Sequence, residues 1–293
     1  MRNQAFAFVK PHAIRSQAVA TTLGAIFEDA GVAVSFTRIV TGPELVRSGV
    51  VDRHFGAVAR GAAHDGTEPL ETTEAGREAF LQHYDEAWED ACKAGRVVGA
   101  DVVRERLGGI GARDLCAAWA EAGAVEVGPD TYVAWFEDAG CYGVNGFYPA
   151  IRESYLAPEA AVQLMLLDFE MPWREFHERV IGDERPEVAF EESIRGFLYD
   201  RAGVLEMLID PVDNVIHASV SPLDALAEKM TWLDEAQWFD DPLLAALSAQ
   251  TGLTPRALAP WVGAQVRERA VLERFLDMDT ERVAKDLAAM MAG

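Results

Sequence analysis

The sequence predicts an α+β protein: a ferredoxin-like antiparallel sheet with helices, to which a helical insertion and a helical C-terminal extension are added. Two observations predict the sheet. Four short apolar segments have the character of buried strands, and each is followed by a segment with helical spacing of its apolar residues. This fourfold alternation of strand and helix is typical of a ferredoxin-like sandwich. A third observation, a Gly-, Thr- and acid-rich stretch from about residue 60, indicates that an insertion interrupts the alternation.

Four segments predict the strands of this sheet. They are short and apolar, and residues 32–40 also alternate and are rich in β-branched side chains. The predicted strands cover residues 5–9, 32–40, 160–169 and 215–217. Residues 204–209 are a further candidate, for a hairpin strand.

The helices between these strands are marked by residues that begin or end helices. The predicted helices cover residues 19–30, 43–55 and 172–182, and the last one begins at Ser221. Gly31 supplies a usual C-terminal stop, and Pro43 a usual first position. Ser221 followed by Pro222 predicts a side-chain cap with proline at the first helical position.

The remaining residues predict two additions to this framework. Residues 61–73 predict a loop, and helical segments follow near 74–94, 100–107 and 112–122, before a possible strand at 131–136 and a tight turn at 143–149. We therefore expect a catalytic domain formed by residues 1–59 and 144–232, a mainly helical insertion at 60–143, and a helical extension at 233–293. About three helices are expected in the extension.

Composition excludes several classes of function. The chain has 26 Lys and Arg against 48 Asp and Glu, and its net charge of -22 disfavours nucleic acid as a partner. A helix-turn-helix in the acidic extension is disfavoured for the same reason. The longest apolar runs, such as residues 164–167, are too short for a membrane span, and no signal peptide is expected. Cys92, Cys116 and Cys141 lack metal-ligand spacing, so we expect buried thiols in a reducing cytoplasm and no zinc site.

Five short motifs occur in one order along the chain. They are Lys10-Pro11, Gly146-Phe147-Tyr148-Pro149, Arg179-Val180-Ile181-Gly182, Glu192-Ser193-Ile194-Arg195-Gly196 and the segment from Asn214 to Ser221, which is followed by Glu228. Together they resemble the nucleoside diphosphate kinase family over about residues 1–56 and 144–232. The resemblance implies the same ferredoxin-like fold.

The resemblance also implies a set of site residues. His217 would accept a phosphoryl group from a Mg²⁺-bound nucleoside triphosphate and pass it to an acceptor. The residues implied in catalysis are His217, Lys10, Glu228 and Ser219; those implied in nucleotide binding are Lys10, Phe55, Phe147, Arg179, Glu184, Arg195 and Asn214. Lys10, Arg179 and Arg195 would neutralise phosphate charge, Asn214 would contact the sugar, and Phe147 would stack on the base. The metal would be carried by the nucleotide rather than by protein ligands.

The residue types support this chemistry independently. A neutral imidazole is a competent nucleophile near pH 7, because its unperturbed pKa is about 6.5. Glu228 follows His217 by eleven residues, so a strand-to-helix return can bring its carboxylate beside the ring, where Ser219 could bond it. Phosphoryl transfer depends mainly on positioning and on charge. The alternative is that a histidine at a strand end is structural, and that Glu228 is a solvated acid.

Several positions depart from the family pattern. Glu184 replaces a threonine that contacts the phosphates, and a carboxylate about 4 Å from a phosphate oxygen would cost up to about 4 kcal/mol at an effective dielectric near 20. Either Glu184 pairs with Arg185 or Arg179, or the ligand is placed differently. Phe55 replaces a tyrosine, and Ala218 and Val220 replace a glycine and an aspartate.

Two functions remain open at this point. The first is a phosphotransferase that acts on a nucleoside diphosphate or on a specialised small-molecule phosphate acceptor. The second is a non-catalytic relative that senses nucleotides or binds a partner protein. A lengthened loop at residues 197–213 disfavours the hexamer of the family, so a homodimer is expected.

Overall fold

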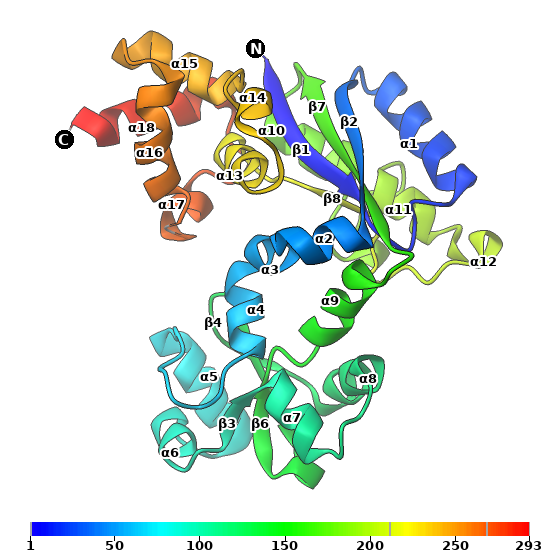
Figure 1. Cartoon of the computed structure of the whole chain (residues 1–293), viewed down its shortest axis with the longest axis vertical. Helices are drawn as coiled ribbons and strands as arrows, with labels where there is room; N and C mark the ends of the chain where they lie inside the picture. Colours follow the sequence, from blue (N-terminus) through cyan, green and yellow to red (C-terminus); the bar gives the residue numbers. More distant parts are fainter. Residues whose placement is uncertain (1, 211, 268, 293) are drawn as a thin grey trace. The chain divides into compact units, whose positions relative to one another are not determined.

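The computed structural model of the protein describes residues 2–210, 212–267 and 269–292. The chain divides into two compact units (Figure 1). Unit 1 consists of Met1–Glu44 and Glu159–Gly293, and unit 2 consists of Leu45–Pro158. Unit 1 is therefore discontinuous in sequence, whereas unit 2 is one continuous segment.

The sheet of unit 1 has the predicted ferredoxin-like topology. Its strands are β1 (Asn3–Val9), β2 (Ala33–Thr41), β7 (Ala161–Phe169) and β8 (Ile216–Ala218). They lie in the order β2-β7-β1-β8, and every neighbouring pair is antiparallel. This order, with helical crossovers after the first and third strands, confirms the predicted fold class.

The helices of unit 1 begin and end near the predicted residues. They are α1 (Gln17–Asp29), α2 (Gly42–Ser48, which continues into unit 2), α10 (Trp173–Glu175), the π-helix η2 (Phe176–Ile181), the 3₁₀-helix η3 (Pro186–Val188), α11 (Ile194–Tyr199), α12 (Ala202–Leu205) and α13 (Pro222–Trp232). The sheet separates two apolar layers because side chains alternate along β1. Ala5 and Ala7 face a core shared with Phe27 of α1, whereas the rings of Phe6 and Phe8 contact Trp232 of α13.

The hairpin strand predicted at residues 204–209 is wrong. α12 ends at Leu205, and an irregular segment follows it. Of the apolar residues that suggested a strand, Ile209 is buried in the core, whereas Val204 and Leu208 are 87% and 68% exposed. Strand β8 pairs with β1 at that edge of the sheet instead.

The C-terminal extension is helical, as expected, and it belongs to unit 1. It contains α14 (Glu235–Trp238), α15 (Pro242–Thr251), α16 (Pro255–Gln265), α17 (Arg269–Arg274) and α18 (Thr280–Ala292). The extension therefore has more helices than the three expected. The sequence did not predict α14 and α17 because they are too short to show helical periodicity.

Unit 2 contains more β-structure than the sequence predicts. Its helices are α3 (Val50–His54), α4 (Gly56–Ala62), α5 (Glu74–Tyr84), α6 (Trp88–Lys93), α7 (Ala100–Arg106), α8 (Ala112–Ala122), η1 (Glu137–Ala139) and α9 (Tyr148–Leu156). Its strands are β3 (Val97–Gly99), β4 (Val125–Gly128), β5 (Thr131–Phe136) and β6 (Cys141–Val144). They form a second sheet in the order β3-β6-β5-β4. Only β5 was predicted, because strands of three or four residues carry little periodicity.

The boundaries of unit 2 are wider than those of the expected insertion at 60–143. Residues 45–59 and 144–158 belong to unit 2, since α4 and α9 pack against each other and against its other elements. The unit occupies the connection between β2 and β7, which is a hairpin in the uninterrupted topology. The first and last peptide groups of that connection remain close, because Gly42 N donates to Ala160 O at 2.6 Å.

Two further expectations concern the whole chain. Among the described residues, no helix has both the length and the apolar character needed to cross a membrane. Cys92 is exposed and Cys141 is buried, and no disulfide occurs in the part of the chain that the structure describes. The expectation of three buried thiols was therefore wrong for Cys92, which lies on the outer face of the short helix α6.

Candidate active site

His217 lies at the centre of β8, opposite Phe8 of β1. Its ring stacks on the Phe8 ring, with centroids 4.8 Å apart and planes 25° from parallel. The side chain is 27% exposed, and its Nε2 lies 2.5 Å from Oε1 of Glu228. This short contact holds the ring by one nitrogen, so any nucleophilic attack by the ring has to use Nδ1.

Glu228 reaches the ring because α13 turns the chain back immediately after β8. Ser221 caps the helix, with its Oγ accepting from Asp224 N at 3.1 Å, and Pro222 occupies the first position. Ser219 fixes the connection to the sheet, since its Oγ donates to Phe6 O at 2.8 Å and accepts from Phe6 N at 3.0 Å. The sequence signals that predicted this helix thus also place the carboxylate.

The pKa values of both acid groups beside the ring are raised. Burial raises the pKa of Glu228 to about 8, against opposing effects of a Ser219 hydrogen bond and the Lys229 charge. Burial and the neighbouring Glu228 raise the pKa of Asp224 to about 7. Burial lowers the pKa of His217 to about 4, so the ring is neutral at physiological pH.

Two cations, the half-buried Lys10 and the buried Arg195, complete this part of the site. Lys10 follows β1, and its Nζ donates to Val212 O at 2.7 Å; burial and the charge of Arg195 lower its pKa to about 8. Arg195 is 4% exposed and donates from Nη2 to Ile216 O at 2.9 Å and from Nη1 to Gly182 O at 2.8 Å. Burial lowers the pKa of Arg195 to about 10. Both cations lower the pKa of His217, so their positive charge reaches the ring.

The backbone just before His217 is strained. Val215 has φ of 72°, and Ile216 N donates to Asn214 O at 2.9 Å, which closes a three-residue γ-turn. A positive φ is unfavourable for a β-branched residue, and such strain clusters at functional sites. Asn214 is 3% exposed; its Nδ2 donates to Glu184 O at 2.9 Å, whereas its buried Oδ1 has no hydrogen-bond partner among the described residues. That oxygen retains its capacity to accept a hydrogen bond.

Arg179 and Glu184, which were predicted to bind the nucleotide, are both exposed. Arg179 lies on η2, is exposed, and places its guanidinium 4.3 Å from the centroid of the Phe190 ring. Glu184 is also exposed, and its charge acts on the pKa values of Lys10 and His217. The ion pair of Arg185 is made with Asp183 at 3.4 Å, rather than with Glu184 as one alternative suggested.

The two predicted aromatic residues belong to unit 2. Phe55 contacts the rings of Tyr148 and Tyr155 edge-on, with centroids 5.7 and 5.9 Å apart. Phe147 contacts Trp119 in the same way at 5.8 Å. Both therefore contribute to the apolar core of unit 2. Their predicted role toward a nucleotide stays a prediction.

Two polar residues near the site were missed. Asp224 lies four residues before Glu228 on α13, and the i,i+4 spacing could have placed both carboxyl groups on one face. His12, which was not among the predicted site residues, has its Nδ1 3.3 Å from Asp213 Oδ1. Burial lowers the pKa of His12, and the charge of Lys10 acts in the same direction. No spacing pattern in the sequence indicated that His12 and Asp213 lie close together.

Comparison with known proteins gives limited further information. No protein-family model matches the chain, and no curated protein matches it. Among solved structures, a nucleoside diphosphate kinase from Encephalitozoon cuniculi is 14% identical, with a TM-score of 0.38 over 81% of this chain and 96% of that chain. An NDP kinase from Pyrobaculum aerophilum is 17% identical, with a TM-score of 0.39 over 80% and 98%. A vanadate- and ADP-bound nucleoside-diphosphate kinase from Borrelia burgdorferi is 12% identical, with a TM-score of 0.36 over 80% and 89%. At such values the likeness carries no argument about function, and the fold class rests on the sheet topology.

Proposed function

We propose that this chain is a phosphotransferase that moves the terminal phosphoryl group of a nucleoside triphosphate through a phosphohistidine at His217. The observation that carries the proposal is the 2.5 Å contact between His217 Nε2 and Glu228, beside a ring kept neutral by burial. A neutral imidazole with one nitrogen held by a carboxyl group has the requirements of an oriented nucleophile. The positive charge of Lys10 and Arg195 supplies the matching attraction for phosphate.

The first step forms a bond between His217 Nδ1 and the terminal phosphorus while the bond from that phosphorus to the bridging oxygen breaks. The nucleoside diphosphate leaves with the electron pair. The ring gains positive charge, which the Glu228 carboxylate offsets through the proton on Nε2. In the second step an oxygen of the acceptor attacks the phosphorus, and the bond to Nδ1 breaks.

The protonation of Glu228 controls this step. When its carboxyl group is protonated, it donates to Nε2, and the ring proton then occupies Nδ1. When Glu228 ionises, Nε2 carries the proton and Nδ1 has the lone pair needed for attack. Because the pKa of Glu228 is raised to about 8, the nucleophilic form increases as pH rises from 6 to 8.

The remaining groups suit a polyphosphate. Arg195 is buried and Lys10 is half-buried, and cations that lose hydration in this way are costly to hold without an anion and are stabilised when one binds. The Asn214 oxygen suits a sugar hydroxyl. Mg²⁺ would accompany the triphosphate and neutralise part of its charge.

The acceptor is a nucleoside diphosphate or a specialised small-molecule phosphate. The resemblance favours the first, and the replacement of a phosphate-contacting threonine by Glu184 favours the second. We further propose a homodimer. Strand β2 lies at the edge of its sheet and exposes Val34 at 47% and Ile39 at 61%, and such an edge can pair with a second copy.

Intact-mass spectrometry after brief exposure to Mg-ATP at mildly alkaline pH tests the proposal. We expect an adduct of about 80 Da, lost in acid and absent from His217→Ala. His83→Ala, at an exposed histidine of α5, is the matched control and should retain the adduct. Binding of triphosphate without an adduct would refute the phosphotransferase and would support the non-catalytic, nucleotide-sensing alternative.

A further inference from the structure

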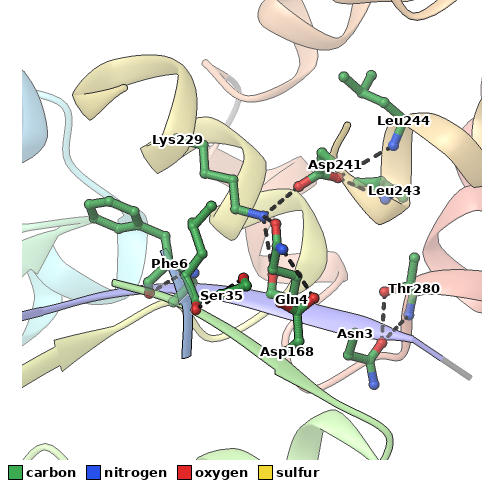
Figure 2. Close-up of polar contacts among 12 residues, drawn as sticks. Asn3, Gln4, Phe6, Ser35, Asp168, Lys229, Asp241, Leu243, Leu244 and Thr280 are labelled. Carbon is green, nitrogen blue, oxygen red and sulfur yellow. Dashed lines mark hydrogen bonds and ion pairs between the residues drawn. The ribbon is translucent and has the colours of Figure 1, made fainter. Parts of the chain in front are cut away.

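A buried ion pair joins the C-terminal extension to the helix that carries Glu228. Lys229, the next residue on α13, is 0% exposed. Its Nζ donates to Asp241 Oδ2 at 2.6 Å and to Gln4 Oε1 at 2.7 Å (Figure 2). One ammonium group thus connects α13 with strand β1 and with the start of α15.

Each partner of Lys229 is itself fixed. Asp241 is 2% exposed, and its other oxygen accepts from Leu243 N at 2.7 Å, which caps α15. The amide of Gln4 donates to Asp168 Oδ1 of β7 at 3.1 Å, as Figure 2 also shows. The position of the Lys229 ammonium is therefore determined by three elements other than its own helix.

A second set of contacts ties the extension to the same region. Asn3 Oδ1 of β1 accepts from Thr280 N at 3.1 Å and from Thr280 Oγ1 at 2.7 Å (Figure 2). Asp277 N donates to Val220 O at 3.0 Å, and Val220 lies in the short loop between His217 and α13. The extension therefore contacts this loop, the helix that follows it, and β1.

These contacts act on the parts of the site that must be aligned. Strand β1 supplies Phe8 beneath the His217 ring, whereas α13 supplies Glu228 beside it. A buried ion pair contributes little net stability compared with apolar side chains, but it demands one geometry. Small displacements of a group that orients a nucleophile can cost about a hundredfold in rate.

We propose that Lys229 and Asp241 are a positioning pair through which the C-terminal extension fixes Glu228 against the His217 ring and thereby sets the rate of histidine phosphorylation. The proposal rests on the proposed function. Neither residue touches the reacting atoms; both act through Glu228.

The charges around Glu228 support the pair. Within unit 1, the titratable and charged groups that act on it are His217 from β8 and Asp224 and Lys229 from its own helix, together with the polar hydroxyl of Ser219. The charge of Lys229 lowers the pKa of Glu228 against the effect of burial. Removing that charge should keep Glu228 protonated to higher pH and reduce the nucleophilic form of the ring.

The test uses the double variant Lys229→Met/Asp241→Asn in the full-length chain. Both charges are removed together, so neither is left buried and unpaired, and asparagine retains the cap of α15. The control is Asp286→Asn in the same extension, which removes the ion pairs of a partly exposed carboxylate with Arg282 of α18 (3.1 Å) and Arg274 of α17 (4.0 Å). Folding of both variants is checked by thermal unfolding.

Single-turnover phosphorylation by Mg-ATP is measured from pH 6 to 9, together with ATP binding. We expect the double variant to react about ten- to a hundredfold more slowly at pH 7, with its pH profile moved to higher pH and its ATP affinity changed less than twofold. Asp286→Asn should match the wild type. A folded double variant with the wild-type rate and pH profile would overturn the positioning role.

A second readout keeps this proposal separate from the proposed function. The His217 ring is titrated by ¹⁵N NMR in the wild type and the double variant, with His217→Ala for assignment. If the wild type forms no phosphohistidine, the proposed function fails, but the ring titration still reports the Glu228 contact. A titration that differs between the two proteins supports the positioning pair, and an identical one overturns it.

Discussion

The same substitution at the half-buried Lys10 and the fully buried Lys229 should change stability in opposite directions. Burial and Arg195 lower the pKa of Lys10 from 10.5 to about 8. Keeping this group charged in the folded, ligand-free protein at pH 7 therefore costs about 3 kcal/mol. Lys10→Met removes that cost and loses one hydrogen bond to Val212 O, worth about 1 kcal/mol. We expect the free energy of unfolding to rise by about 2 kcal/mol.

Lys229→Met should have the reverse effect, because Asp241 would be left buried without its cation. Breaking such a pair from one side costs about 3–5 kcal/mol. The stability change expected for Lys10→Met also depends on pH. The folded-state pKa of Lys10 lies below its unfolded value, so the cost is fully present below pH 8 and disappears as pH rises toward 10.5.

Scanning calorimetry without nucleotide measures both variants. For a unit of this size, about 2 kcal/mol corresponds to an increase of about 4–8 °C in the midpoint of unit 1 for Lys10→Met. Activity should fall at the same time by about a hundredfold or more in kcat/KM, because a phosphate contact is lost. Lys285→Met, at an exposed lysine of α18, controls for the substitution itself. A less stable or fully active Lys10→Met would refute the reasoning.

Three further predictions follow from the site and from unit 2. The kcat/KM for triphosphate should peak near pH 8, since Glu228 must lose and Lys10 must keep its proton; Glu228→Gln should abolish the rising limb of the measured profile. Gly182→Ala should weaken triphosphate binding in calorimetric titration by about tenfold, because φ is 95° and a Cβ would meet a serine hydroxyl at 2.3 Å, displacing the carbonyl that holds Arg195. Asn145→Ala should destabilise unit 2 by about 3 kcal/mol or more, since three backbone groups lose their partner, and hydrogen exchange should accelerate in unit 2 only.

Three strands of unit 1 could be predicted because they have seven to nine residues and are flanked by residues that begin or end helices, and the short strand β8 because it lies within a motif. The ends of β1, β2 and β7 differ by about two residues or fewer from the predicted strands at 5–9, 32–40 and 160–169. Unit 2 was less predictable. Strands β3 and β4 are too short for a periodic pattern, and Pro149, which suggested a turn, occupies the start of α9.

The site was predictable where local motifs determine it. The capped helix after His217 explains why Glu228 arrives beside the ring, and the β1–β8 pairing explains why Lys10 lies nearby. Contacts between distant segments could not be predicted. Lys229 and Asp241 resemble surface charges in the sequence, and only the packing of the extension reveals that both are buried.

The placement of unit 2 between β2 and β7 has a consequence for the order of folding. In an uninterrupted sheet these strands pair early, because a short hairpin loop costs little chain entropy. Here an unfolded Leu45–Pro158 segment would raise the free-energy cost of closing the loop between β2 and β7 by about 3 kcal/mol. A continuous segment that folds first shortens this loop, because it brings its own two ends to fixed positions. We therefore expect unit 2 to fold before the β2–β7 ladder closes, so that slow folding of the inserted unit delays assembly of the sheet that carries the candidate active site.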